Sequence, residues 1–168
     1  MNCFIKESIE SLDTQLNIIQ TCISRLEDDD IWKKFRQETN SIGNLCLHLA
    51  GSEYAFISSI IGGKPFIRQR SKEFTDNRVM NSDQLIENLI LTRQRSKEVV
   101  GNFDFNDLEK SIEMPSTTST LIPEPGKIHS CLSVILYVVE HYAYHTGQIV
   151  YMTKLLQTKN EHILKWTH

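Results

Sequence analysis

The sequence predicts an all-α protein, a four-helix bundle whose second and third connections are long. Four segments, at about residues 2–27, 41–61, 83–100 and 128–157, repeat apolar residues at helical spacing. Glycine and proline separate these segments, most clearly at Gly62-Gly63 and between residues 115 and 126. The chain has 168 residues, so we expect one domain covering residues 1–168.

Composition excludes several classes of function. Hydrophobic residues make up 40% and charged residues 23% of the chain, which is ordinary for a globular protein. The net charge of −3 and the lack of a basic cluster argue against a mainly electrostatic nucleic-acid binder. We find no signal-peptide pattern, and no apolar run approaches the roughly 20 residues of a membrane span. The expectation is a cytoplasmic protein without nucleic-acid or membrane partners.

The cysteines fit a reducing compartment. None of them forms a CxxC motif, and all four fall inside helical patterns: Cys3, Cys22, Cys46 and Cys131. We therefore expect buried, reduced thiols and no disulfide framework.

The first helix is predicted to end near Glu27, and Asp28, Asp29 and Asp30 to form a solvated turn. An acidic run at a helix C-terminus would oppose the helix dipole, which favours the turn. In the connection that follows, Trp32 and Phe35 are expected to cover one end of the core.

The second helix begins after a capping residue, Asn40 or Ser41, and stops at Gly62-Gly63. His48 lies beside its main apolar stripe, among small residues such as Ser52 and Ala55. Small side chains there leave room for a pocket or permit close helix packing, and both interpretations stay open.

The third helix is predicted to be capped by Ser82 or Asp83 and to place Arg93 on its solvent-exposed face. The preceding residues 63–80 form a polar loop with three arginines, Arg68, Arg70 and Arg78. These arginines are either solvated charges or a means of capturing a carboxylate or phosphate at the mouth of a site.

Residues 102–127 are predicted to be irregular, because their prolines rule out a continuous helix. A short pairing of residues 108–114 with a neighbouring segment is expected, and this crossover is placed to close over a site. The tail after residue 157 is weakly specified.

The last helix carries an unusual stripe of residues spaced four, three, four and three apart. Three polar side chains, His141, His145 and Gln148, interrupt an otherwise apolar face that includes Val134 and Val138. Buried polar groups need partners, so the spacing of the two histidines predicts that both bind one metal ion. A satisfied histidine pair without a metal is the plainer explanation of an HxxxH motif.

His48 of the second helix is the candidate third ligand. Three neutral imidazoles suit Zn²⁺ or Ni²⁺, with Fe²⁺ and Cu²⁺ as further options, whereas Mg²⁺ and Ca²⁺ want oxygen ligands. Three protein ligands also leave a position for substrate, which is typical of a catalytic site. Gln148 is placed to orient a ligand or water. The other histidines, His129, His162 and His168, are expected at the surface or at caps, and Tyr144 and Tyr151 in core or interface packing.

Two stretches together resemble the DinB-like, or YfiT-like, superfamily of four-helix metalloproteins: NSIGNLCLHLAG (40–51) and VEHYAYHTGQIVYMTKLL (139–156). The piece FISSIIGGKPFIRQRSKEF is similar to a branch of unknown function. The resemblance covers nearly the whole chain and implies one divalent metal on His48, His141 and His145. It also implies a cytoplasmic, often homodimeric protein.

The superfamily includes thiol-dependent transferases and isomerases together with metal-dependent hydrolases. The resemblance therefore implies an enzyme in which the metal holds a low-molecular-weight thiol as thiolate for attack on an electrophile. In that hypothesis Arg68 or Arg70 steadies the carboxylates of the thiol. A hydrolase and a non-catalytic, dimeric metal-binding module are the alternatives, because fold and metal site do not determine the substrate.

Overall fold

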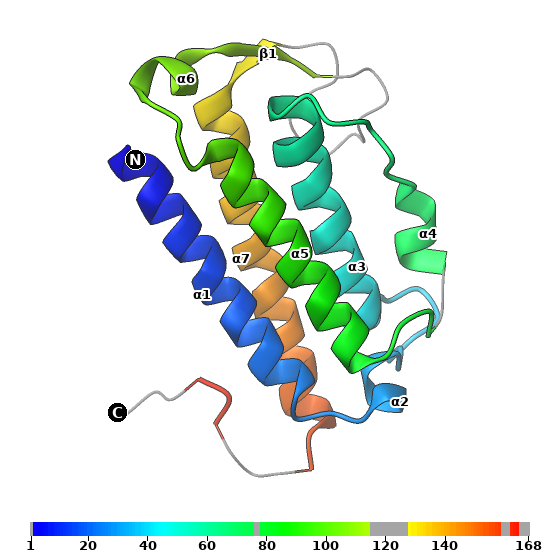
Figure 1. Cartoon of the computed structure of the whole chain (residues 1–168). Coiled ribbons are helices and arrows are strands. Elements are labelled where there is room, and N and C mark those ends of the chain that lie inside the picture. Colours follow the sequence, from blue (N-terminus) through cyan, green and yellow to red (C-terminus); the bar gives the residue numbers. More distant parts are fainter. Residues whose placement is uncertain (1, 76–77, 115–127, 159–161, 165–168) are drawn as a thin grey trace.

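The computed structural model describes residues 2–75, 78–114, 128–158 and 162–164. Four long helical segments pack side by side, as predicted, and form a four-helix bundle (Figure 1). These segments are α1 (Cys3–Ile23), α3 (Ile42–Glu53) continued by η1 (Tyr54–Ile61), α5 (Ser82–Val100) and α7 (Cys131–Leu156).

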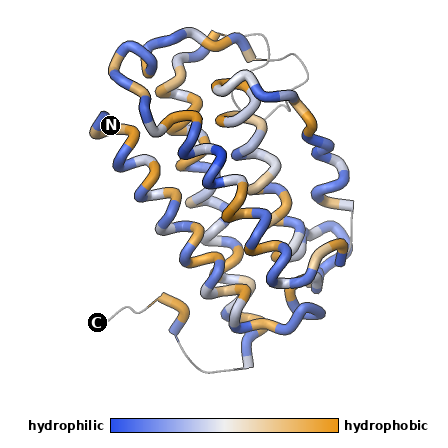
Figure 2. Tube along the Cα trace, viewed as in Figure 1, coloured by the Kyte–Doolittle hydropathy of each residue, from blue (hydrophilic) through white to orange (hydrophobic). Residues whose placement is uncertain are grey.

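Each long helix packs against two neighbours, so that the four enclose one core. Helix α1 lies between α5 and α7, and α3 completes the ring on the opposite side. Figure 2 shows apolar and polar residues alternating along every long helix. The apolar members meet inside, where Leu12, Leu49, Leu89 and Val138 are each at most 2% exposed. Burial of such amphipathic stripes is the main force that assembles the bundle.

Shorter elements join the long helices. They are α2 (Asp28–Ile31), α4 (Arg70–Thr75), α6 (Phe105–Glu109) and an antiparallel pair of strands, β1 (Ser111–Glu113) and β2 (Ile128–Ser130). The expected pairing of residues 108–114 with a neighbouring segment is therefore confirmed. None of the helices in the described residues combines the length and apolar character that a membrane span requires.

The predicted turn at Asp28–Asp30 was wrong, because α1 ends at Ile23 and the aspartates begin a new helix, α2. In the first helical turn their negative charges favour the helix dipole, whereas at the end of α1 they would oppose it. The last helix also begins later than predicted. Residues 128–130 form β2, in which His129 pairs with Ile112, and Ser130 caps α7.

The second long helix changes its winding within its predicted bounds. Ser41 and Asn44 form a capping box at its start, yet its last eight residues, Tyr54–Ile61, are a π-helix. Such winding is rare and occurs frequently at functional sites. The polar loop predicted at residues 63–80 contains α4, which packs against α3 (Figure 1).

Several side chains lie where periodicity did not place them. Arg93 was expected in solvent, but it is only 2% exposed. Conversely, Cys3 is exposed, as is Phe35 at 45%. Tyr144 and Tyr151 are 65% exposed each, which excludes core packing and leaves interface packing. Trp32 does cover the core as expected. The tail prediction falls largely on residues 159–161 and 165–168, which lie outside the described part of the chain, as does the second half of the 102–127 crossover, residues 115–127.

Candidate metal centre

Three histidines from two helices converge beside α4. His48 comes from α3, and His141 and His145 come from successive turns of α7. One ring nitrogen of each histidine lies within 4.8 Å of the others. In the described residues, this is the single cluster of histidine, cysteine or carboxylate groups arranged closely enough to hold a metal ion.

A carboxylate sets the tautomer of His48. Glu73 of α4 lies with Oε2 at 2.9 Å from His48 Nδ1, and a carboxylate can only accept, so Nδ1–H donates. The lone pair of His48 is therefore on Nε2, which lies 3.0 Å from His141 Nε2. Metal-binding histidines commonly donate their second ring N–H to a carboxylate in this way.

Glu73 is itself held in place by Arg68. The guanidinium Nε and NH2 groups donate to the two carboxylate oxygens at 2.6 and 2.8 Å. Burial favours a higher pKa for Glu73, but hydrogen bonds from Arg68 and His48 outweigh it and leave the pKa below its usual value. Glu73 therefore stays ionised and accepts hydrogen bonds from both neighbours.

Gly51 makes room for this ion pair against α3. A Cβ atom built at Gly51 would lie 2.3 Å from Glu73 Oε1 and 3.4 Å from Arg68 Nε. Any larger residue at Gly51 must push the carboxylate away. The sequence offers a signal here only in retrospect, since glycine inside a helix is unfavourable without a packing reason.

His145 is oriented by Gln148, one turn later on the same helix. Its Nδ1–H donates to Gln148 Oε1 at 2.7 Å, which leaves the lone pair on Nε2. His141 stacks on Tyr137, with ring centroids 5.5 Å apart. Gln148 thus fixes the orientation of the His145 ring.

The donor set fits a divalent transition-metal ion. His48 and His145 present Nε2 lone pairs to one region, and His141 Nε2 lies 3.0 Å from His48 Nε2. A tetrahedral zinc site, with bonds of about 2.0–2.1 Å, would place neighbouring nitrogens about 3.3 Å apart. Burial, with smaller contributions from His48 and His145, lowers the pKa of His141 to about 3, so that its ring is neutral and able to bind a metal.

The two predicted arginines have different surroundings. Arg68 is engaged with Glu73, and its NH2 also lies 3.1 Å from His48 Nδ1. Arg70 is exposed, and its guanidinium carbon lies 5.2 Å from the centroid of the Phe74 ring. Phe74 in turn packs on His48 at 4.8 Å, so Arg70 stands near the rim of the cluster.

Other candidates are directed elsewhere. Glu53, five residues after His48 on the same long helix, pairs with Arg93 in the core. Glu140 is exposed, and His129 lies in β2 rather than at the start of the last helix. The important residue that periodicity missed is Glu73, because it belongs to a segment with no apolar repeat.

Replacing Glu73 with glutamine should weaken metal binding about 10–100-fold, the usual cost of losing a carboxylate behind a histidine ligand. Gly51→Ala should act in the same direction, because its methyl group displaces the same carboxylate. Metal affinity can be measured by competition with a chromogenic chelator. Glu140→Gln, an exposed neighbour of His141, is the control and should change nothing. Equal affinity in Glu73→Gln and the wild type would show that Glu73 does not support the centre.

The stability of the metal-free protein should fall as the pH is lowered below about 6.5. The unfolded chain then binds a proton at His141 that the folded chain refuses until about pH 3. At about pH 5 the loss is about 2 kcal/mol. Urea unfolding in the presence of a chelator measures it, and His141→Asn should show a smaller drop between neutral and acid pH. An identical drop in that variant would contradict the assignment.

Comparisons with known proteins place the chain in a family. The family model described as "Protein of unknown function (DUF1572)" matches residues 1–167. No protein of curated function matches the chain in sequence.

Solved structures share the fold at low identity. A DinB-like protein from Bacillus cereus has a TM-score of 0.66 and 12% identity, over 89% of this chain and 91% of that one. YfiT from Bacillus subtilis, described as a probable metal-dependent hydrolase with an unusual four-helix bundle topology, has a TM-score of 0.67 and 14% identity, over 90% and 86%.

A mycothiol-dependent maleylpyruvate isomerase has a TM-score of 0.64 and 12% identity, over 89% of this chain and 63% of that one. Likeness at these identities establishes the fold and leaves the chemistry to be argued from the site. The match over nearly the full length leads to one conclusion: the chain belongs to the DUF1572 family, and it shares its fold with DinB-like and YfiT proteins.

Proposed function

We propose that the protein is a divalent-metal-dependent enzyme, and that in its preferred form it is an S-transferase using a low-molecular-weight thiol such as bacillithiol. The observation that carries the proposal is the convergence of His48, His141 and His145 within 4.8 Å, with Glu73 and Gln148 orienting two of them. Structural sites usually have four protein ligands, whereas three leave a position for substrate.

The metal in this proposal is zinc or nickel, with iron as a further option, because all three protein ligands are neutral imidazoles. When bound, such an ion supplies Lewis acidity that favours the thiolate form of a thiol. The protein orients the ligands through Glu73 and Gln148. Arg70, exposed at the rim, is the proposed partner for the thiol's carboxylates, while Arg68 has the separate role of holding Glu73.

Thiol-dependent chemistry and its alternative, hydrolysis, are each supported by a structural neighbour. A mycothiol-dependent isomerase supports the use of a thiol, and YfiT, a probable metal-dependent hydrolase, supports activation of water. The half-buried His141 and His145 suit a small molecule reaching the cluster in either case.

Turnover assays separate the two reactions. Metal-loaded protein is given bacillithiol and monochlorobimane in one assay, and a nitrophenyl ester without thiol in the other. The transferase proposal expects conjugation that needs both thiol and metal and that disappears in the His141→Ala, His145→Ala double variant. Metal-dependent ester cleavage without any thiol would favour the hydrolase. Stoichiometric metal without either activity would favour a non-catalytic metal-binding module.

A homodimer formed through α7 completes the proposal of a cytoplasmic enzyme. Four large apolar side chains share one exposed face of this helix at 47–65% exposure: Leu136, Tyr144, Tyr151 and Leu155. Their spacing of eight, seven and four residues keeps them in one stripe. Burial of such a stripe against a second copy would remove it from water.

Tyr151→Lys should convert the dimer into a monomer, because the introduced charge would be buried in an apolar interface. Sedimentation velocity at several protein concentrations measures the change. Phe105→Lys replaces an aromatic residue of similar exposure, 63%, in α6 and should leave the dimer intact. A wild-type monomer, or a Tyr151→Lys dimer of unchanged stability, would contradict the proposed interface.

A further inference from the structure

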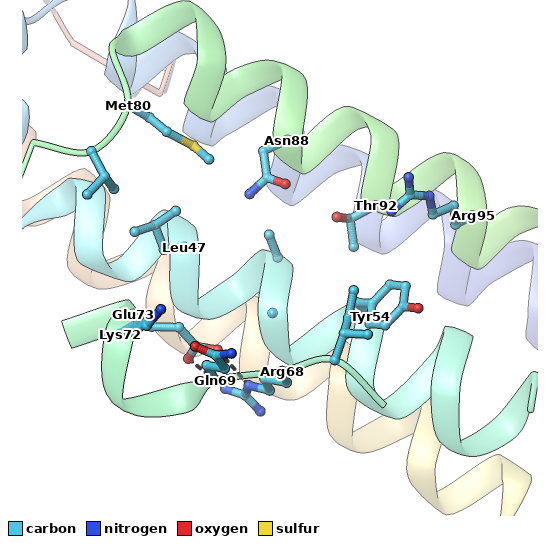
Figure 3. Close-up of a pocket in the computed structure, with 14 residues that line it drawn as sticks. Leu47, Tyr54, Arg68, Gln69, Lys72, Glu73, Met80, Asn88, Thr92 and Arg95 are labelled. Carbon is cyan, nitrogen blue, oxygen red and sulfur yellow. Dashed lines mark hydrogen bonds and ion pairs between the residues drawn. The ribbon is translucent and has the colours of Figure 1, made fainter. Parts of the chain in front are cut away.

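A cavity of about 410 Å³ lies between α3 and α5, beside the segment that leads into α4 (Figure 3). Its size falls within the range of about 300–1,000 Å³ typical of sites for small organic ligands. The histidine cluster does not line it. Arg68 and Glu73 do line it, and they also contact His48, so the ion pair stands between the two sites.

The two ends of the cavity are positively charged. Figure 3 shows Lys72 at one end, near Arg68 and Glu73, and Arg95 at the other end, near Tyr54 and Thr92. Within the described residues, neither Lys72 nor Arg95 forms an ion pair. The Arg68 guanidinium is matched by the Glu73 carboxylate. The cavity therefore presents two uncompensated cations, separated along its length.

The wall between the two ends is mainly apolar. It is lined by Leu47 and Ala50 of α3 and by Val79 and Met80 before α5. Ile67 also lines it, and belongs to residues 64–69, the covering segment that leads into α4. Such a surface gains little from a small hydrated ion, but it removes a hydrocarbon body from water. An apolar middle with a cation at each end is complementary to an elongated molecule with an anionic group at each end.

The covering segment is fixed in place by the π-helix. Tyr54, the first residue of η1, lines the cavity and donates its hydroxyl to the Pro65 carbonyl at 3.1 Å. One turn later, Ser59 Oγ donates to the Lys64 carbonyl at 2.9 Å. The rare π winding thus places two side chains that tie down the start of the cover. A cavity whose wall and cover are bonded together is preformed, which lowers the entropic cost of binding.

We propose that this cavity is a second ligand site, separate from the metal centre, for an elongated organic dianion with an apolar body. A medium-chain dicarboxylate has this chemistry, with one carboxylate at Arg95 and the other at Lys72. Arginine and lysine both form charge-assisted hydrogen bonds to carboxylates, and the hydrocarbon lies against Leu47, Ala50 and Ile67.

Calorimetric titration of chelator-treated protein tests the proposal without any contribution from a metal. The probes are three molecules of equal chain length: octanedioate, octanoate and octylamine. Octanedioate should bind saturably, octanoate about tenfold more weakly because one ion pair is lost, and octylamine should not bind. Hexanedioate and decanedioate then show which length spans the cavity.

Variants place the binding at the two ends. Arg95→Gln and Lys72→Gln should each weaken octanedioate about tenfold, and both positions are exposed, so the fold should be retained. Ala50→Leu should fill the cavity and abolish binding. Lys33→Gln, an exposed lysine outside the cavity, is the matched control, and the His141→Ala, His145→Ala double variant should bind octanedioate normally.

Three outcomes would overturn the proposal. They are no saturable binding of any dicarboxylate, equal binding of octylamine and octanedioate, or octanedioate binding that is indifferent to both Arg95→Gln and Lys72→Gln. Loss of octanedioate binding in the double histidine variant alone would also overturn it, because the anion would then be held by the histidine cluster.

Discussion

Replacing His141 and His145 together with alanine is expected to abolish stoichiometric metal binding. The two residues supply two of the three clustered imidazoles. Losing a partner behind a ligand typically weakens a metal site about 10–100-fold, so losing two ligands should cost more than about a hundredfold. The wild type should also unfold at a higher temperature when metal is added, because an ion that binds only the folded state stabilises it. The double variant should show no such increase.

Metal content after purification and thermal unfolding with and without added zinc or nickel measure both effects. His162→Ala removes an exposed histidine remote from the cluster and serves as the matched control. Full metal content in the double variant, or none in the wild type, would leave the histidine cluster without its proposed ion. The metal recovered from cells also depends on availability, so loading with defined ions is the stricter measurement.

Replacing Glu53 with glutamine should destabilise the fold by about 3–5 kcal/mol, the usual cost of breaking a buried ion pair. Glu53 is fully buried and Arg93 is 2% exposed. The guanidinium donates to both carboxylate oxygens, at 2.7 and 3.1 Å, and its NH1 also reaches Asp13 Oδ1 at 3.2 Å. Burial opposes the charge on Arg93, but the Glu53 carboxylate outweighs it and keeps the pKa of Arg93 above its ordinary value. The variant therefore retains a buried cation without its main partner.

Urea unfolding at neutral pH measures this loss. Glu38→Gln is the control, because it removes the carboxylate from an exposed ion pair with Arg36 whose side chains are 75% and 66% accessible. Exposed pairs contribute at most about 1 kcal/mol. The double replacement Arg93→Met, Glu53→Leu should recover most of the lost stability, since no unpaired charge is left inside. A Glu53→Gln cost below that of Glu38→Gln would contradict the role given to the buried pair.

The histidine cluster shows how much of the candidate site residue spacing can predict. His141 and His145 are four residues apart, and a helix places such residues on one face, so their proximity follows from local geometry. Their approach to His48 depends on packing between α3 and α7. The apolar stripes of those two helices predicted that they would pack together. The structure brings the three together, and the binding of a metal there remains a prediction.

Glu73 and the buried Glu53–Arg93 ion pair are features that residue spacing could not predict. Glu73 belongs to α4, a helix of six residues without an apolar repeat, and it reaches His48 only because Gly51 leaves space for it. Arg93 was placed in solvent because charged residues are rarely buried. Its burial depends on Glu53, which comes from another helix forty residues away in sequence.

The sequence by itself determined the four-helix bundle, the helix that carries each histidine and the chemical type of the proposed ligands. These properties follow from helical period, capping residues and side-chain chemistry, all of which act over a few neighbouring residues. Only the tertiary structure decided that Glu73 orients His48, that Arg93 is buried against Glu53, and that a cavity with a cation at each end lies between α3 and α5. Those features depend on contacts between segments distant in the chain, where the energy of a polar group is set by the partner that packing brings to it.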